Sequence, residues 1–583
     1  MELKYTDEKA VLLLIATLKV NNIHRIIVSP GSANFTFVGS LQHDDFFELY
    51  SCVDERSAAY MACGMAAESG EPVVITCTGA TAPRNYFPGL TEAYYRKLPI
   101  LAVCCRREVS KIGHLYDQQV DERNVPADIA NTQIWLPIVK DNEDEVYCRN
   151  ELNKAIIALQ SHGGGPVFLN LCSNRSQNMT IQELPKVGKM EYYTMRDPFP
   201  VMPHGRIAIA IGAHAKFSVK EIELIDAFCA SYDAIVICDH TSGYYGEYGV
   251  HTALIFGQKC RTDLLQFDLV ISAGEISGDT MGLTRVRPND VWRISEDGQF
   301  RNRFNNTGKV FEMSLGDFCK EYILEGVQSD SSIKRFRQAY SDIYAQIPEL
   351  PFSNIWIAKQ LSRGIPQGAA ISFGILNSLR SWNLFDLPKG VDGMCNVGGF
   401  GIDGTLSTAI GRSIANPNRL TYCVLGDLAF FYDMNSLGNR HIGKNLRILL
   451  INNGIGDEFR IYDNPQAYMG EEVRPYIAAE GHYGHQSTTL VKDYVAALGF
   501  KYLTASTKEE FNLCVGEFLN AELNQSVVFE VMTRPEDDTE ALDIIKHIVK
   551  SPKAPVSKKK IIKDKIKTIV GQQKIDAVKT LLK

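Results

Sequence analysis

The sequence predicts an α/β protein made of three doubly wound parallel-sheet domains in series. Strand-like runs rich in β-branched residues, among them HRIIVSPG, PVVITCTG and LPILAVCC, alternate with amphipathic stretches along the chain. This alternation is typical of parallel sheets covered by helices. In addition, 583 residues are too many for one ordinary domain, because domains of roughly 100–200 residues are usual.

The alternation falls into three blocks of similar size without a detectable sequence repeat. The first block, 1–185, closes near PVFLNLCS, and the polar, proline-bearing stretch up to about residue 200 is expected to be a linker. The second block, 195–330, contains the runs RIAIAIGAHA, AIVICDH and DLVISAGE. The segment SDSSIKRFRQAYSDIYAQIPELP then predicts a helical connection into a third block, 355–545.

Composition excludes several classes of protein. The formal charge of −7 argues against a nucleic-acid-binding protein. The fourteen cysteines are scattered and form no CxxC pair, which fits a reducing cytoplasm better than a disulfide framework or a zinc site. The start MELKYTDEK is charged where a signal peptide is apolar, and no run approaches the roughly 20 apolar residues that span a bilayer. We therefore expect a soluble, cytoplasmic protein.

Two strand ends in the third block carry the residues of a metal site. The run TYCVLGD ends at Asp427, a helical stretch follows, and the next strand ends at Asn452 and Asn453. Parallel strands joined by one crossover have their carboxyl ends side by side, where ligands of open α/β sheets bind. One carboxylate, one amide oxygen and a carbonyl oxygen from the following loop suit Mg²⁺, and therefore a diphosphate. The alternative is that Asp427 is a helix N-cap and the asparagines form a turn.

The string Gly399–Gly404 offers a rival interpretation as a GxGxxG dinucleotide fingerprint, with Asp427 as the ribose-binding acid. That fingerprint requires a buried strand before the glycines, whereas the preceding KGVDGMCNVG is rich in glycine and poor in apolar residues. A simpler use of the glycines is a tight loop that lets a cofactor approach the backbone, with GTLSTAIGRSIA as the following helix.

These residues resemble the metal motif of thiamine-diphosphate enzymes, in which Gly-Asp is followed after one crossover by Asn-Asn; Leu428 replaces the usual glycine. Within that superfamily the chain most resembles the menaquinone-pathway synthase family, the 2-succinyl-5-enolpyruvyl-6-hydroxy-3-cyclohexene-1-carboxylate synthases. The matching segments, in the same order, are SPGS, VDERSAAYMACGMA, CTGATAPRNYFPGLTEAYYRKLPI, GFGIDGTLSTA and GDLAFFYDMNSL. The resemblance covers the first and third blocks well and the second only by position.

The resemblance implies pyrimidine-binding, central and diphosphate-binding domains, with thiamine diphosphate and Mg²⁺ as cofactors. It assigns Glu55 the carboxyl group that hydrogen-bonds the cofactor's aminopyrimidine and so favours the imino tautomer. It makes Ile402 the apolar wedge that keeps the cofactor bent. Asn453 and the carbonyl of Ile455 would complete the metal set with Asp427. Further positions that it places at the cofactor are Ser378, Gly401, Gly426, Leu428 and Phe459.

The resemblance also implies two polar active-site residues in the first block, Arg107 and Gln118. The segment GHLYDQQVDERN around Gln118 departs from the family's sequence pattern. In the enzymes that the chain resembles, the cofactor is held between the first and third blocks of two different subunits. A homodimer or homotetramer is therefore expected.

The substrate pocket departs from the resemblance. The menaquinone-pathway enzymes grip carboxylate-rich substrates with arginines, because a guanidinium fork matches a carboxylate. Three of those positions here are Ala33, Trp382 and Val397, and Arg380 is the nearest cation that could substitute. We therefore expect a different substrate pair: a small 2-oxo acid and a carbonyl acceptor.

Three functions stay open at this point. The first is a decarboxylase/carboligase that transfers an acyl-anion equivalent to the acceptor, in surface-polysaccharide synthesis if the basic tail binds membranes. The second is a simple 2-oxo acid decarboxylase, and the third is a non-catalytic paralogue that acts as a binding or assembly partner. Joint retention of Glu55, Asp427 and Asn453 favours an enzyme.

The segment 551–583 differs from the rest of the chain. It has ten lysines and two aspartates, so its net charge is +8 and that of the remaining chain is −15. Isoleucines, valines and leucines recur at helical spacing opposite the lysines, which predicts a basic amphipathic helix. Such a helix could make peripheral contact with an anionic membrane. The alternatives are a helix docked on the protein's own acidic body and a solvated tail.

Overall fold

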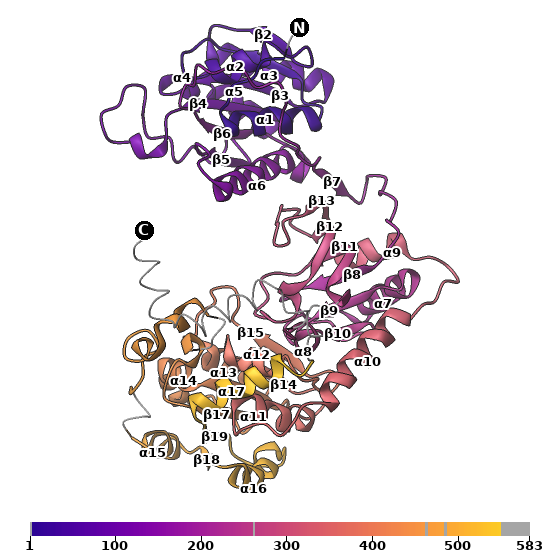
Figure 1. The fold of residues 1–583 in the computed structure, drawn as a ribbon, viewed down its shortest axis with the longest axis vertical. Helices are drawn as coiled ribbons and strands as arrows, with labels where there is room; N and C mark the ends of the chain where they lie inside the picture. Colours follow the sequence, from indigo (N-terminus) through magenta and orange to yellow (C-terminus); the bar gives the residue numbers. More distant parts are fainter. Residues whose placement is uncertain (1–2, 260–262, 461–463, 483–486, 550–583) are drawn as a thin grey trace, which may run out of the picture.

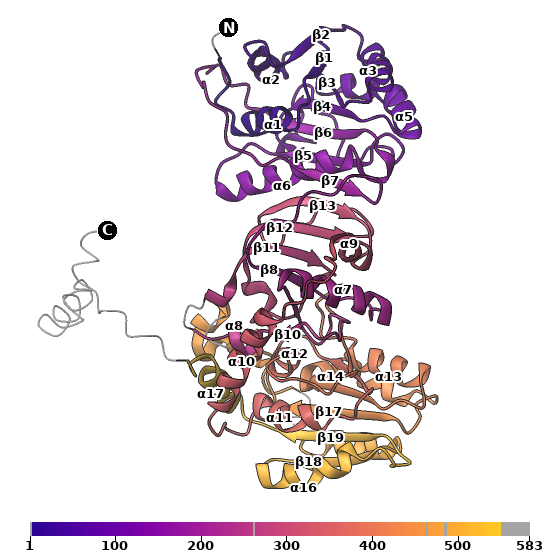
Figure 2. The ribbon, with the colours of Figure 1, turned by 90° about the vertical axis from the view of Figure 1, so that its right-hand side faces the viewer.

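The computed structural model describes residues 3–259, 263–460, 464–482 and 487–549. It shows three parallel sheets in series, each flanked by helices (Figures 1 and 2). The expected fold class is therefore confirmed for this part of the chain. The expected basic helix of 551–583 lies outside the described residues.

The first sheet is doubly wound. Its strand order is β2 (Glu48–Ser51), β1 (Arg25–Val28), β3 (Val73–Thr78), β4 (Ile100–Arg106), β6 (Val167–Cys172) and β5 (Thr132–Leu136). Separate apolar clusters fill its two faces. The helices of this block are α1 (Lys9–Val20), α2 (Phe35–Leu41), α3 (Glu55–Ser69), α4 (Thr81–Asn85), α5 (Phe87–Arg96) and α6 (Asn142–Ala158).

Local sequence signals determine the bounds of helix α3, which carries Glu55, one of the three catalytic candidates of this block. Asp54 is its N-cap and accepts a hydrogen bond from the backbone nitrogen of Ser57 at 2.9 Å. Gly70 ends the helix in the left-handed region, at φ 70°. A Cβ on Gly89 would lie 2.5 Å from the Cβ of Ala59, so only glycine lets α5 pack this closely on α3. Glu55 is thereby held in the first helical turn, directly after the edge strand β2.

The middle sheet has the order β10 (Gly249–His251), β9 (Ile235–Cys238), β8 (Ile207–Ile211), β11 (Gln266–Ala273), β12 (Arg287–Ser295), β13 (Thr307–Glu312) and β7 (Glu191–Thr194). Strand β7 lies in the stretch expected to be a linker; it pairs with β13 and forms an edge of this sheet. The helices are α7 (Val219–Tyr232), α8 (Ala253–Phe256) and α9 (Leu315–Tyr322). The predicted helical connection is confirmed as α10 (Ser331–Ala345).

The third sheet repeats the topology of the first without a visible sequence repeat. Its order is β15 (Asp392–Cys395), β14 (Ala370–Phe373), β16 (Thr421–Gly426), β17 (Leu446–Asn452), β19 (Val527–Met532) and β18 (Lys501–Ala505). In both sheets the chain changes direction between the first and third strands of the block. The helices are α11 (Asn354–Leu361), α12 (Asn377–Trp382), α13 (Thr405–Ala415), α14 (Asp427–Asp433), α15 (Leu490–Ala497), α16 (Lys508–Leu519) and α17 (Pro535–Lys546).

The three blocks are arranged linearly, with the first and third sheets at opposite ends and the middle sheet between them (Figures 1 and 2). One continuous apolar cluster joins the middle and third blocks. The cysteines that the structure describes are all free, and Cys104 and Cys105 are buried in β4 as expected. None of the helices in the described ranges is long and apolar enough to cross a bilayer.

Candidate cofactor site

The pocket of interest opens at the carboxyl edge of the third sheet, where β14 and β16 lie side by side. This is the point at which the strand order reverses, and open α/β sheets bind ligands there. The lining comes from the loop after β14, the residues that follow β16, and the loop after β17. Of the sequence-predicted residues, the pocket brings together Ser378, Ile402, Gly426, Asp427, Leu428, Asn453, Ile455 and Phe459. Gly401 directly precedes Ile402.

Asp427 connects two of these strand ends. It is the first residue of α14 and is buried. Its Oδ1 accepts from the backbone nitrogen of Leu428 at 2.8 Å, and its Oδ2 accepts from the backbone nitrogen of Gly454 at 2.7 Å. The N-cap alternative is not observed, because Gly426 is the N-cap of α14. The carboxylate therefore ties the end of β16 to the loop after β17.

The two adjacent asparagines have different surroundings. Asn452 is buried and does not line the pocket; its side chain donates to Glu530 Oε1 of β19 at 2.8 Å. Asn453 lines the pocket and donates from Nδ2 to Asp538 Oδ2 at 3.2 Å. The amide oxygen of Asn453 accepts from the backbone nitrogen of Ile455 at 3.3 Å, and its second lone pair is available for a metal ion.

Asp538 was not found from the sequence, because it follows Asn453 by 85 positions and no motif contains it. It also accepts from the backbone nitrogen of Asn354 at 2.6 Å and from the hydroxyl of Thr533 at 3.2 Å. Burial raises the pKa of Asp538 to about 6, and these hydrogen bonds oppose the shift. It holds the amide of Asn453 at the start of the loop.

The loop after β17 carries two more acidic residues that the sequence analysis did not single out. Both carboxylate oxygens of Asp457 are buried without a hydrogen-bond partner. Burial, with a further contribution from the charge of Asp538, raises the pKa of Asp457 to about 8. Glu458 forms a bidentate ion pair with Arg380, in which Nη1 and Nη2 of the guanidinium each lie 2.7 Å from a carboxylate oxygen. Arg380 is thus already paired and does not provide the free clamp considered from the sequence.

The dinucleotide interpretation does not fit the topology. The strand before the glycine string is β15, an edge strand that pairs with β14. The fingerprint places its acidic residue at the end of the neighbouring strand. Asp427 instead follows β16, and β14 lies between β15 and β16.

The first-block candidates lie at the carboxyl edge of their own sheet. Glu55 is half-buried at the start of α3. Arg107 follows β4 and pairs with Asp117 at 2.8 Å. Gln118 is exposed, and its backbone adopts φ 53° beside Gly79. Within one chain, this block and the third-sheet pocket are at opposite ends of the molecule (Figure 2).

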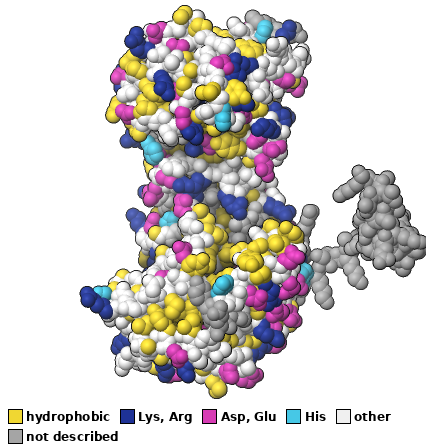
Figure 3. Space-filling view, turned by 90° about the vertical axis from the view of Figure 1, so that its left-hand side faces the viewer, with side chains coloured by type: hydrophobic (Ala, Val, Ile, Leu, Met, Phe, Trp, Pro, Cys, Tyr) yellow, Lys and Arg dark blue, Asp and Glu magenta, His cyan; other side chains and the backbone are white. Residues whose placement is uncertain are grey.

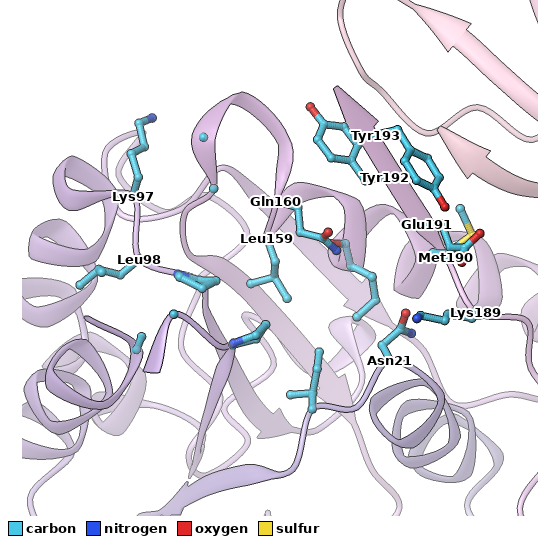
Figure 4. A pocket seen from close by; sticks show the side chains of 18 of the residues that line it. Asn21, Lys97, Leu98, Leu159, Gln160, Lys189, Met190, Glu191, Tyr192 and Tyr193 are labelled. Carbon is cyan, nitrogen blue, oxygen red and sulfur yellow. The ribbon is translucent and has the colours of Figure 1, made fainter. Parts of the chain in front are cut away.

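A larger cavity, of about 760 Å³, lies elsewhere (Figure 4). Its lining includes Lys97, Lys189, Tyr192 and Tyr193, together with residues that precede β1, β3 and β4. It therefore opens at the amino edge of the first sheet, opposite to Glu55. None of the predicted site residues lines it.

The positions expected to lack a carboxylate clamp are buried. Ala33, Trp382 and Val397 are 2%, 0% and 6% exposed, and the last two belong to the core that joins the middle and third blocks. Trp382 packs against Phe373 with ring centroids 5.7 Å apart. These side chains pack in the apolar interior, and none of them carries a positive charge that could pair with a substrate carboxylate.

Comparison with known proteins shows which proteins the chain is similar to. Residues 9–125 match the family model described as "Thiamine pyrophosphate enzyme, N-terminal TPP binding domain". The first block is therefore a thiamine-diphosphate-binding domain. A 2-succinyl-5-enolpyruvyl-6-hydroxy-3-cyclohexene-1-carboxylate synthase of Bacteroides fragilis is 29% identical over 94% of this chain and the whole length of the relative. Synthases with the same name from Bacteroides thetaiotaomicron and Flavobacterium psychrophilum are 28% and 26% identical, over 94% and 89% of this chain and 100% and 95% of their own lengths.

The residues of the third-sheet pocket fit thiamine diphosphate bound through Mg²⁺. The candidate ligands, a carboxylate, an amide oxygen and the carbonyl of Ile455, are hard oxygen donors that suit Mg²⁺. In the described part of the chain, no three His, Cys, Asp or Glu side chains gather into a metal-binding cluster, so a zinc-type site is not observed there. Ile402, Leu428 and Phe459 supply the apolar wall that aromatic rings require.

Proposed function

We propose that this enzyme binds thiamine diphosphate through Mg²⁺ and transfers an acyl-anion equivalent from a 2-oxo acid to a carbonyl acceptor. The observation that carries the proposal is the convergence of Asp427, Asn453 and Ile455 at one strand-order reversal. In the reaction, the bond between the carboxyl and carbonyl carbons breaks and CO₂ leaves. The electron pair stays on the former carbonyl carbon, which then bonds to the acceptor carbon, and the acceptor oxygen takes a proton.

When bound, thiamine diphosphate would supply a carbon nucleophile and would stabilise the electron pair on the former carbonyl carbon. Asp427, Asn453 and the carbonyl of Ile455 would hold Mg²⁺, and Ser378 and Gly426 would lie beside the diphosphate. Ile402 would keep the two rings together, and Phe459 would cover the reacting carbon.

Glu55 would share a proton with the aminopyrimidine, and it would come from a second subunit. The distance between the two blocks within one chain supports this (Figures 1 and 2). Exposed apolar residues lie near Glu55 and near the third-sheet pocket. Val53, Tyr60 and Met61 are close to Glu55 in the sequence, and Phe400 and Tyr432 are close to pocket residues. Apolar side chains are visible on the surfaces of both blocks (Figure 3). A homodimer, or a homotetramer built from such dimers, would cover them.

Arg107 and Gln118 would reach the substrate from the same side as Glu55. Both lie at the carboxyl edge of the first sheet, and Gln118 is exposed in the single chain. If the acyl anion is protonated rather than transferred, the enzyme is a simple decarboxylase.

The test is a screen of 2-oxo acids for CO₂ release by the protein loaded with thiamine diphosphate and Mg²⁺, with and without aldehyde and ketone acceptors. Carboligation predicts that an acceptor is consumed in equal amount with the CO₂ released. Release without acceptor consumption would identify a simple decarboxylase. Tight cofactor binding without turnover of any acid would favour the non-catalytic paralogue.

A further inference from the structure

An internal ion pair borders the cofactor pocket. Arg380 of α12 and Glu458 of the 3₁₀ helix η7 (Asp457–Arg460) make two parallel hydrogen bonds of 2.7 Å. Their side chains are only 10% and 16% exposed. Arg380 also donates to Asn377 Oδ1 at 3.0 Å. A paired guanidinium fork of this kind is oriented by both of its acceptors.

The pair lies where a substrate tail would extend. Glu458 and Asn377 both line the pocket, and Glu458 directly precedes Phe459. Ser378, the candidate for the diphosphate, is on the same short helix as Arg380. A 2-oxo acid that reacts beneath Phe459 would therefore have its side chain close to Glu458.

The pairing has a consequence for charged substrates. Both terminal nitrogens of Arg380 already bond to Glu458, so a substrate carboxylate cannot bind to this edge of the guanidinium. A second carboxylate placed beside Glu458 would also meet a like charge in a partly desolvated pocket. The nearby Arg460 does not line the pocket, and its Nη2 donates to Glu536 Oε1 at 3.2 Å.

We infer that Glu458 is a specificity-determining residue that neutralises Arg380 and excludes 2-oxo acids with a distal carboxylate, so that the donor is a 2-oxo acid with an uncharged tail. The inference rests on the proposed function, because it assumes that a 2-oxo acid reacts in this pocket. Removing the charge of Glu458 should free Arg380 to bind a distal carboxylate.

Two donors of equal chain length isolate the effect of the distal charge: 2-oxopentanoate and 2-oxoglutarate. CO₂ release by the holoenzyme gives kcat/KM for each acid, in wild type and in Glu458→Gln. Wild type should prefer 2-oxopentanoate by at least tenfold, and Glu458→Gln should shift the ratio at least tenfold toward 2-oxoglutarate. The matched control is Glu517→Gln, which removes an equal charge from the part-buried ion pair between Glu517 of α16 and Lys501 of β18 and should leave the ratio unchanged.

Equal use of both acids by wild type, or an unchanged ratio in Glu458→Gln, overturns the inference while the proposed function stands. If wild type releases CO₂ from neither acid nor from any other 2-oxo acid, the proposed function fails. In that case the affinities of the cofactor-loaded protein for the two acids, measured by calorimetry, test the inference. The ratio of these affinities should shift toward 2-oxoglutarate in Glu458→Gln, and an unchanged ratio would overturn the inference.

Arg380→Gln combined with Glu458→Gln identifies the group that binds the distal carboxylate. The double variant should lose the 2-oxoglutarate activity that Glu458→Gln gains. If the double variant keeps that activity, Arg380 is not the group that binds the distal carboxylate. If Glu458→Gln fails to fold because Arg380 is left unpaired, Glu458→Asp replaces it. The shorter carboxylate of Asp should lose one of the two hydrogen bonds to Arg380 and shift the kcat/KM ratio in the same direction by a smaller factor. An unchanged ratio in a folded Glu458→Asp protein would count against the inference.

Discussion

The carboxylate of Asp427 and the backbone nitrogen of Gly454 lie 2.7 Å apart, which joins the end of β16 to the loop after β17. This contact draws together the residues proposed to bind Mg²⁺. Asp427→Ala removes both the contact and a metal ligand. We expect thiamine diphosphate affinity in the presence of Mg²⁺ to fall by at least about 100-fold, more than for a partner that only orients a ligand.

Calorimetry with Mg²⁺ and with excess chelator tests this expectation. Asp493→Ala, which removes an exposed carboxylate from α15 in the same block, is the control and should bind normally. Undiminished affinity in Asp427→Ala would disprove the metal assignment.

The hydrogen bond from Asn453 to Asp538 gives a second prediction. Asp538→Ala should lower the apparent Mg²⁺ affinity by about 10–100-fold, because the amide of Asn453 loses its orienting partner. A Mg²⁺ titration of cofactor binding measures the effect, and a thermal melt in the absence of cofactor separates it from lost stability. An unchanged titration midpoint in a folded variant would show that Asn453 is held by other contacts.

Glu55→Gln should keep the fold and lower turnover by orders of magnitude, because an amide cannot donate the proton that stabilises the imino tautomer. Exchange of the C2 proton on bound cofactor is the direct measurement. Glu68→Gln, which changes an exposed residue of the same helix, should exchange at the wild-type rate. If Glu55→Gln also exchanges at that rate, Glu55 does not act on the cofactor.

Chains with complementary defects should restore activity when mixed. Glu55→Gln chains keep an intact third block and Asp427→Ala chains keep an intact first block, so a heterodimer contains one complete site if the site spans two subunits. Under conditions that permit subunit exchange, up to about a quarter of wild-type activity should return, because half of the dimers are mixed and each has one of two sites. Verified heterodimers without activity would indicate sites within single chains.

The contact between His251 and Asp386, 3.0 Å across the boundary between the middle and third blocks, gives a pH-dependent prediction. Burial opposes the charge on His251, but the hydrogen bond to Asp386 outweighs it and raises the His251 pKa well above 6.5, with a further contribution from Cys238. Partial desolvation raises the pKa of Asp386, but the hydrogen bond from His251 and its charge outweigh this and lower that pKa. The neighbouring His240 stays neutral, because burial and His251 lower its pKa to about 3.

The stabilisation from His251 is fully present below its unfolded pKa of about 6.5 and is lost as the pH rises through the higher folded value. That from Asp386 is present above about pH 4 and is lost as the pH falls through the lower folded value. Asp386→Asn should therefore cost roughly 0.5–1 kcal/mol near pH 6, a small value because the Asp386 side chain is 56% exposed. Thermal melts from pH 5 to 9 should show the difference shrinking toward alkaline pH, and a constant difference would contradict the assignment.

The sequence by itself determined the α/β class, because β-branched runs and amphipathic stretches alternate locally and need no knowledge of the fold. It also determined the pairing of Asp427 with the loop after β17, since parallel strands joined by one crossover must align their carboxyl ends. The tertiary structure decided which of the two asparagines faces the pocket, because Glu530 from β19 engages Asn452 and Asp538 engages Asn453. It also decided that Arg380 pairs with Glu458. The two residues are 78 positions apart, and side-chain pairing at that separation depends on tertiary packing rather than on any local pattern.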